Sequence, residues 1–218
     1  MAPRDSVKHF DSRPRASSTY NSVISACEKG GQSDRALRLL AAMREAGLRP
    51  DVYSYSAAIS ACEKGAQFAR ALELLGEMQS AGIAPNVVTY SAAISACEKG
   101  GLWQDALKLL DQMQAARVAP NVITYNAAIS ALEKGGHGEL ALALLNEMRA
   151  AGVAPDTITF SSAIAACQKS GRREAAAAIE VGRGAVGEGE WPASLSFNAA
   201  LKGAPKRPRW DARGELVR

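Results

Sequence analysis

Apolar residues of the stretch 17–51 fall into two sets with helical spacing. The first set is Tyr20, Ile24 and Cys27, and the second is Ala36, Leu40 and Met43. Within each set the members are spaced i, i+4 and i+7, which places them on one face of a helix. The stretch therefore predicts two helices, each with one apolar face and one polar face.

Polar and turn-forming residues mark the ends of both predicted helices. Thr19 stands before the first apolar set and is expected to cap the first helix, which Gly30 and the glycine after it close. The second helix is expected to begin near Asp34 and to stop at Gly47, with Pro50 just beyond it. This punctuation predicts a helical hairpin.

The hairpin pattern repeats along the chain every 35 residues. The phrase YSAAISACEKG occupies residues 55–65 and again 90–100, and near-copies occupy 20–30 and 125–135. The residue before the recurrent aromatic residue always carries a hydroxyl: Thr19, Ser54, Thr89, Thr124, Thr159 and Ser196. A hairpin cannot bury its apolar faces alone, so repeated hairpins stack. We expect an all-α fold, a right-handed α-solenoid of stacked antiparallel helix-turn-helix repeats.

The period divides the chain into a repeat array and two flanking segments. Complete units are expected at 17–51, 52–86, 87–121 and 122–156, a degenerate unit at 157–193 and a partial unit at 194–202. The array of residues 17–202 is preceded by an N-terminal extension, 1–16, and followed by a basic C-terminal tail, 203–218. Both flanking segments are expected to be disordered.

Charge is distributed unevenly between the array and the tail. The 218 residues carry a formal net charge of +4, yet residues 17–156 contain twelve Lys and Arg against fourteen Asp and Glu. The excess lies in the flanking segments, so anion binding by the repeats must come from local placement. No apolar run approaches the ~20 residues that span a bilayer, and no membrane association is expected.

The four cysteines could form disulfides or a zinc site, but their spacing follows the repeat. Cys27, Cys62, Cys97 and Cys167 occupy equivalent positions, and Leu132 fills the same position in the fourth unit. Leucine neither ligates metal nor oxidises. Equivalent helices lie ~8–10 Å apart, whereas a disulfide needs Cα atoms within about 7 Å. We interpret the cysteines as reduced, buried apolar residues.

A polar face of the first helix also recurs. Asn21, Ser25 and Glu28 lie on one face, away from the apolar set. The residue directly after the aromatic residue is always Asn or Ser: Asn21, Ser56, Ser91, Asn126, Ser161 and Asn198. A solvated helix face explains the polarity of this position but not its restriction to two residue types.

These features together resemble the pentatricopeptide repeat family, in its P-type, 35-residue form. The resemblance rests on the period, the opening VTYSAAISACEKG, the Ala-x-x-Leu-Leu-x-x-Met second helix and the Gly-x-x-Pro-Asp/Asn ending, and it covers about residues 17–202. Tetratricopeptide repeats differ, because their period is 34 residues and their Trp, Leu-Gly and Tyr pattern is missing here.

The resemblance implies binding of single-stranded RNA at about one base per repeat. It pairs the residue after the aromatic residue with the residue after the recurrent proline: Asn21 with Asp51, Ser56 with Asn86, Ser91 with Asn121, and Asn126 with Asp156. The family's preferences for these pairs imply a 5′-UAAU-3′ core, read with the N-terminal unit toward the 5′ end. Ala193 in the fifth unit offers no hydrogen bond, so that unit should read poorly.

Two further groups of residues acquire roles from the resemblance. Bases would be sandwiched between the side chains of Tyr53, Val88, Ile123 and Ile158. Lysines at the end of each first helix are candidates for phosphate contact, namely Lys29, Lys64, Lys99 and Lys134, with Lys169 continuing the series. The same lysines would also interact favourably with the helix dipole.

Motifs for catalysis are not found in the sequence. His9 and His137 are the two histidines, no Cys-x-x-Cys pair accompanies them, and no Gly-rich loop follows a strand. We expect no enzymatic activity, catalytic residue, metal or cofactor. The prediction is a monomeric, non-catalytic, sequence-selective RNA-binding protein, with other RNA-processing proteins as further partners. The resemblance implies a role in RNA processing, stability or translation in a mitochondrion or chloroplast. The alternative is an α-solenoid scaffold that binds proteins.

Overall fold

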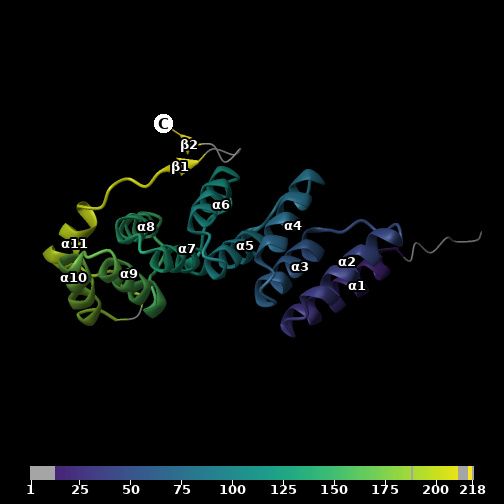
Figure 1. Cartoon of the computed structure of the whole chain (residues 1–218), viewed down its shortest axis with the longest axis horizontal. Coiled ribbons are helices and arrows are strands. Elements are labelled where there is room, and N and C mark those ends of the chain that lie inside the picture. The colour runs from purple at the N-terminus through teal and green to yellow at the C-terminus, as the bar shows by residue number, and fades with distance from the viewer. Residues whose placement is uncertain (1–12, 188, 211–215, 218) are drawn as a thin grey trace, which may run out of the picture.

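The computed structural model describes residues 13–187, 189–210 and 216–217, which form a row of helical hairpins (Figure 1). The helices are α1 (Arg13–Lys29), α2 (Ser33–Glu45), α3 (Val52–Lys64), α4 (Phe68–Ser80), α5 (Val87–Lys99), α6 (Trp103–Ala115), α7 (Val122–Gly135), α8 (Gly138–Ala150), α9 (Thr157–Lys169), α10 (Arg173–Gly184) and α11 (Leu195–Lys202). Two short strands, β1 (Arg209–Trp210) and β2 (Leu216–Val217), pair antiparallel near the C-terminus.

The helices form two layers with different spacing. The odd-numbered helices from α1 to α9 each pack against the next odd-numbered helix, whereas each even-numbered helix packs between the odd-numbered helices of its own and the following unit. Among the described elements, neighbouring even-numbered helices make no comparable contact with one another, and they splay apart in Figure 1. The tighter odd-numbered layer therefore lines the concave side. The predicted all-α solenoid is confirmed.

The core consists of the apolar sets identified in the sequence. The recurrent aromatic residues Tyr55, Tyr90, Tyr125 and Phe160 are at most 4% exposed, and Met43, Met78, Met113 and Met148 are fully buried. The four cysteines are buried and free, and Leu132 is buried in the equivalent place. Each unit thus buries its apolar faces against its neighbours, which is why stacking supplies the core.

Caps of the odd-numbered helices differ from the sequence prediction. In α3, α5, α7 and α9 the N-cap is the residue after the recurrent proline, and the hydroxyl expected to cap the helix stands three residues later. In α3 the backbone N–H of Ser54 donates to Asp51 Oδ1 over 2.9 Å, and the N–H of Asp51 donates to Ser54 Oγ over 3.1 Å. This capping box satisfies two helix-start donors at once. In α1 the helix begins at Arg13, so Thr19 lies inside it.

The flanking segments are more ordered than expected. Residues 13–16 belong to α1, so disorder was the wrong prediction for them, and residues 1–12 lie outside the described part of the chain. Residues 203–210 run from α11 past α8 to α6 (Figure 1), and the Arg207 side chain is buried against carboxylates. The expected disorder of the tail is therefore wrong for residues 203–210, while 211–215 and 218 lie outside the described part. Within the described ranges, none of the helices has both the length and the apolar composition that a bilayer crossing requires.

A left-handed residue ends each first helix. This position is glycine at Gly31, Gly101, Gly136 and Gly171, with φ between +63° and +77°, but in the second unit it is Ala66 at φ 59°. A side chain in this conformation places its Cβ too close to the following carbonyl oxygen. Ala66 is consequently a strained position in an otherwise regular series.

Replacing Ala66 with glycine is expected to stabilise the protein. Glycine relieves the left-handed strain, but it also gives the unfolded chain more backbone freedom, which offsets part of the gain. The net increase in the free energy of unfolding should be about 0.5–1 kcal/mol. Gly101→Ala is the reciprocal control, because its Cβ would meet open space and only the conformation is strained. Urea unfolding measures both changes, and equal signs for the two variants would contradict the explanation.

The buried cysteines should be protected from thiol reagents in the native protein. Burial raises the pKa of the Cys97 thiol to about 12 and the pKa values of Cys62 and Cys167 to about 11, which keeps them protonated at neutral pH. We expect slow reaction of native protein with an aromatic disulfide reagent at pH 8. After denaturation without reductant, four equivalents should react, and fewer would indicate a disulfide that the structure does not contain.

Candidate nucleic-acid interface

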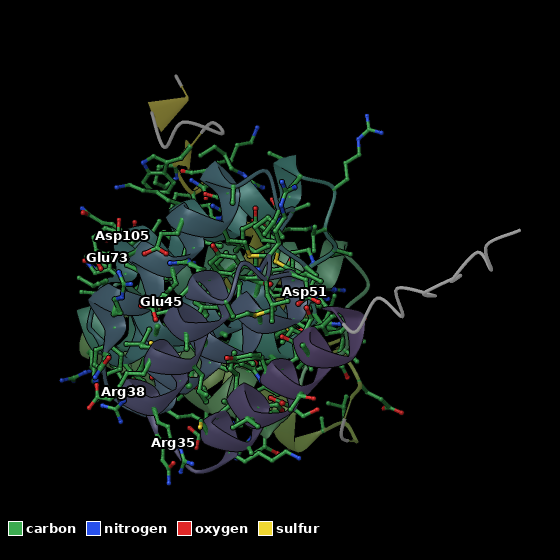
Figure 2. The ribbon with its side chains drawn as sticks, turned by 90° about the vertical axis from the view of Figure 1, so that its right-hand side faces the viewer. Arg35, Arg38, Glu45, Asp51, Glu73 and Asp105 are labelled. Carbon is green, nitrogen blue, oxygen red and sulfur yellow. The ribbon has the colours of Figure 1, made fainter. Side chains whose placement is uncertain are left out.

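The concave side of the array carries a groove lined by small and polar side chains. One part of it, about 910 Å³, is lined by residues of α1 and α3 and by the start of α5, including Asn21, Ser25, Asp51, Tyr53, Ser56 and Asn86. Figure 2, which looks along the array from the α1 end, shows Asp51 on the flank opposite to Arg38, Glu73 and Asp105 of the even-numbered helices. The groove is therefore separated from the charged outer layer.

Units 1 and 4 bring their predicted asparagine–aspartate pairs into direct contact. Asn21 Nδ2 donates to both carboxylate oxygens of Asp51 over 3.1 Å, although 30 residues separate the two in sequence. Asn126 Nδ2 contacts Asp156 in the same way, at 2.9 Å to each oxygen. The capping hydroxyl completes the arrangement, since Ser54 Oγ donates to Asn21 Oδ1 over 2.6 Å. Stacking of neighbouring units thus assembles each pair.

Units 2 and 3 connect their serine–asparagine pairs through the capping threonine. Ser56 Oγ lies 2.6 Å from Thr89 Oγ1, which in turn donates to Asn86 Oδ1 over 3.0 Å. Unit 3 repeats this chain with Ser91, Thr124 and Asn121, with hydroxyl oxygens 2.8 Å apart. Among the described residues, the amide nitrogens of Asn86 and Asn121 have no hydrogen-bond partner. They remain available to a ligand in the groove.

Capping decides which atom each pair presents to the groove. The backbone N–H of the N3 residue donates to Oδ1 of Asp51, Asn86, Asn121 or Asp156 in every one of these units. With Oδ1 occupied, the remaining atom is a carboxylate oxygen, an acceptor, in units 1 and 4. In units 2 and 3 it is an amide nitrogen, a donor. Units 1 and 4 thus present a hydrogen-bond acceptor at this position, whereas units 2 and 3 present a donor.

An exposed apolar row accompanies these pairs. Tyr53, Val88, Ile123 and Ile158, one at the second position of each odd-numbered helix from α3 to α9, are 71%, 55%, 59% and 58% exposed. Tyr53 and Val88 line the groove together with Asn21 and Ser56. Large apolar side chains left this exposed at a regular spacing are typical of a binding surface.

The recurrent lysines form a ladder of ion pairs that the sequence prediction did not foresee. Lys64 Nζ lies 2.8 Å from Glu28, and Lys99 and Lys134 lie 2.5 Å from Glu63 and Glu98. Lys169 pairs with Glu133 in the same manner. Each glutamate belongs to the preceding unit and occurs in the Glu-Lys-Gly part of the repeated phrase. The recurrence of both residues was visible in the sequence, but the pairing itself depends on how neighbouring units stack. Within the described residues, Lys29 has no ion-pair partner.

The ladder limits the charge that the groove offers to phosphate. Both members of each pair are partly exposed, and such pairs contribute about 0–1 kcal/mol. A phosphate could therefore displace a glutamate, but it would leave that glutamate unpaired beside the bound anion. Of the lysines proposed for phosphate contact, Lys29 is the one that escapes this competition.

Metal-binding geometry is not found in the described ranges, where no group of three or more His, Cys, Asp or Glu side chains converges. The assembled surface instead offers paired polar side chains, an exposed apolar row and compensated charge. Such a surface can bind flat, hydrogen-bonding groups one unit at a time.

Stacked hairpins with one recurrent polar pair per unit define an α-solenoid of helical repeats. The sequence profile of the PPR repeat family matches residues 15–64 and 120–169, that of the pentatricopeptide repeat domain matches 73–134, and that of the single PPR repeat matches 53–83. The chain belongs to the pentatricopeptide repeat family. None of the curated proteins searched matches the sequence.

Solved structures share this fold. The chain is 17% identical to the PPR domain of Arabidopsis thaliana protein-only RNase P 1, solved in complex with tRNA, with a TM-score of 0.69 over 85% of this chain and 96% of that one. It is 26% identical to the pentatricopeptide repeat protein PPR10 of maize, solved with an 18-nt psaJ RNA element, with a TM-score of 0.59 over 84% of this chain. The match covers 27% of PPR10, just over a quarter of that protein.

Acid should reveal the contribution of Asp156 to stability. Burial raises the pKa of this carboxyl, but hydrogen bonds from Thr159 and Asn126 outweigh it and leave the pKa below its usual value. A lowered folded-state pKa gives stability that is present above the unfolded value of about 3.9 and is lost as the pH falls through the folded value. We expect Asp156→Asn to cost about 0.5–1 kcal/mol at pH 7, because the site is partly exposed to solvent.

The free-energy difference between wild type and Asp156→Asn should shrink as the pH falls below about 4. Urea unfolding at several pH values measures it. Glu45→Gln serves as the control, because Glu45 is exposed on the outer helix α2. A difference between wild type and Asp156→Asn that stays constant down to pH 2 would contradict a role for the charged carboxylate.

Proposed function

We propose that the chain is a non-catalytic, sequence-selective single-stranded RNA-binding protein that reads about one base per repeat. The observation that carries this proposal is the set of four polar pairs in one groove, each with its capping oxygen engaged. The second atom is an amide nitrogen with no partner among the described residues in units 2 and 3, and a carboxylate oxygen that already accepts from the paired asparagine in units 1 and 4. A protein-binding surface would not need the same two residue types at the same two positions in every unit.

The hydrogen-bonding sense of each pair suggests which base it takes. In units 1 and 4 the second carboxylate oxygen of Asp51 or Asp156 accepts from the paired asparagine, and its other lone pair can accept a further hydrogen bond, which suits the ring N–H of uracil. In units 2 and 3 the free amide of Asn86 or Asn121 donates, which suits the unprotonated ring nitrogen of adenine. With the polarity that the family implies, the four units prefer a 5′-UAAU-3′ core.

Stacking supplies most of the binding energy in this proposal. The second, third and fourth bases each lie between the exposed apolar side chains of consecutive units, whereas the first lies between Ser18 and Tyr53; each stacked base contributes about 1–3 kcal/mol. Tyr53 offers a ring face to the first two bases, while the aliphatic Val88, Ile123 and Ile158 separate the later ones. Four units of this kind are expected to bind RNA with micromolar affinity.

Phosphate contacts contribute less than in a basic RNA-binding protein. Lys64, Lys99 and Lys134 each release a glutamate when they contact phosphate, so few net charges are gained. The affinity should therefore fall only weakly with salt, since the slope is about −0.7 per phosphate neutralised on single strands. Because the lysine charges are compensated, sequence-independent attraction to the RNA backbone is weak, and the contacts to the bases account for a larger share of the binding energy.

Family membership supports the cellular side of the proposal. PPR10 was solved with an RNA element, and at 26% identity it is the basis for assigning RNA as the partner here. We propose a monomer that acts in RNA processing, stability or translation in a mitochondrion or chloroplast, together with other RNA-processing proteins. The near-neutral ladder favours the second candidate, a protein-binding scaffold, which the same experiment tests.

Exchanging the pair of unit 3 should exchange its base. Ser91→Asn with Asn121→Asp reproduces the pair of unit 4, in which the asparagine donates to both carboxylate oxygens while the cap is kept. Wild type should prefer UAAU over UAUU in an otherwise identical oligonucleotide, and the double variant should prefer UAUU. Each preference should amount to about 1 kcal/mol or more, roughly fivefold in Kd.

Fluorescence anisotropy at one fixed salt concentration measures the four affinities. Ser95→Asn is the matched control, because it adds an asparagine to the same face of α5 one turn beyond the pair, and it should leave the preference unchanged. If both proteins bind RNA without distinguishing the two sequences, readout by these pairs is wrong. If neither binds RNA, the scaffold function takes its place.

A further inference from the structure

A second polar site lies on the outer layer, away from the groove. Asp111 of α6 is buried and Glu147 of α8 is half-buried beside it, with side chains 4% and 16% exposed. Two neighbouring buried carboxylates are costly unless cations compensate them. In this structure the cations come from the C-terminal segment, residues 203–210.

Arg207 fills the space between the two carboxylates. Its Nη2 lies 2.7 Å from Asp111 Oδ1, and its Nε donates to Glu147 Oε2 over 2.8 Å. Nη2 also donates to Glu147 Oε1 over 3.2 Å, so the guanidinium makes a two-point contact with one carboxylate while it bonds the other. The Arg207 side chain is 2% exposed, which is rare for arginine unless its donors are matched.

Neighbouring residues of the segment complete the contact. Arg209 Nη1 donates to Asp111 Oδ1 over 2.9 Å and to Gln114 Oε1 over 2.6 Å. The backbone N–H of Trp210 donates to Asp111 Oδ2 over 2.9 Å, and its ring packs against the core. The carboxylates therefore hold an Arg-x-Arg-Trp sequence through two side chains and the backbone.

Another unit boundary shows why a segment from outside the hairpins is needed here. Between units 1 and 2, Arg44 of α2 donates to Glu77 over 2.7 Å and to the hydroxyl of Tyr55 over 2.8 Å. The equivalent positions between units 3 and 4 are Gln114, Glu147 and Tyr125, so the arginine is replaced by a glutamine. Asp111 adds a second negative charge where units 1 and 2 have Ala41 and Gly76. The boundary between units 3 and 4 therefore lacks an arginine of its own and has one more carboxylate, so a cation from outside the hairpins can bind there.

We propose that Asp111, Gln114 and Glu147 form a recognition site for peptide segments of the type Arg-x-Arg-Trp, with residues 207–210 of this chain as the resident ligand. We name these three residues the arginine pocket. The pocket lies on α6 and α8, beside which the C-terminal segment runs (Figure 1), whereas the groove is lined by α1, α3 and the start of α5, so a peptide in the pocket leaves the groove open. The proposal does not depend on RNA binding.

When residues 207–210 occupy the pocket, the C-terminal segment is held against α6 and α8 in the middle of the array. Most described contacts between elements join the same or adjacent units, whereas Trp210 reaches Asp111 across 99 residues of sequence. A tethered ligand of this kind acts at an effective concentration in the millimolar range. A free peptide should therefore compete poorly with the chain's own segment and bind well once that segment loses its arginines.

The test uses a fluorescein-labelled peptide of residues 203–212 and full-length variants of the chain. Arg207→Ala with Arg209→Ala removes the resident ligand and should bind the peptide at least about tenfold more tightly than wild type. Lys202→Ala with Lys206→Ala removes the same charge from exposed positions and should bind like wild type. Adding Asp111→Asn and Glu147→Gln to the arginine variant should abolish the gain.

A second peptide, with lysine at both arginine positions, separates geometry from charge. The lysine peptide should bind the Arg207→Ala/Arg209→Ala chain at least about tenfold more weakly than the arginine peptide does, because lysine cannot make the two-point contact. Equal binding of both peptides would indicate an acidic surface without recognition. Equal peptide affinity of wild type and the arginine variant would overturn the proposal.

Thermal unfolding keeps the proposal testable if the arginine variant folds poorly. Arg207→Ala should lower the Tm of the wild-type chain, since it removes the buried guanidinium and leaves the two carboxylates with Arg209, whose side chain is 46% exposed, as their remaining cation. In a chain that already carries Asp111→Asn and Glu147→Gln, the same substitution should lower the Tm by less than half as much. Additive changes in Tm would show that Arg207 and the carboxylates act independently, which contradicts the pocket.

Discussion

The hydrogen bond from the N3 backbone N–H to the Asp or Asn before each odd-numbered helix determines both the start of the helix and the direction of the proposed base-reading atom. In α5, for example, Thr89 N–H donates to Asn86 Oδ1 over 3.0 Å. This bond satisfies a helix-start donor and holds one side-chain oxygen inward. The other atom of the same side chain must then face the groove, so the fold and the candidate site use opposite ends of one group.

Stacking is the second requirement, because every functional contact joins two units. The Asn21 and Asp51 side chains meet only where α1 packs beside α3, and Lys64 reaches Glu28 across the same boundary. The period of 35 residues keeps these contacts identical from unit to unit, so the presented bases would be evenly spaced. Differences between units then reside in the side chains alone.

Charge compensation governs both faces of the array. On the concave side, glutamates pair with the lysines, so under the proposed function the specificity would come from hydrogen bonds and stacking. On the outer side, the carboxylates of Asp111 on α6 and Glu147 on α8 need guanidinium groups to compensate their charge, and the hairpins of units 3 and 4 do not supply them. The basic C-terminal segment, which looks like a nonspecific tail by composition, supplies them. Arg207 and Arg209 are consequently engaged by carboxylates of the array.

The amino-acid sequence by itself determined the repeat, its helical hairpins and the buried set that includes Tyr90, Met113 and Cys97, because these follow from local periodicity. It also predicted the positions of the polar pairs through the family resemblance. Only the tertiary structure decided that Asp51 rather than Ser54 caps α3, that the lysines from Lys64 onward meet a glutamate of the preceding unit, and that Arg207 is buried. The reason is physical: the last two depend on contacts between residues 36 or more positions apart, and the cap depends on which of two polar side chains three residues apart reaches the helix-start N–H.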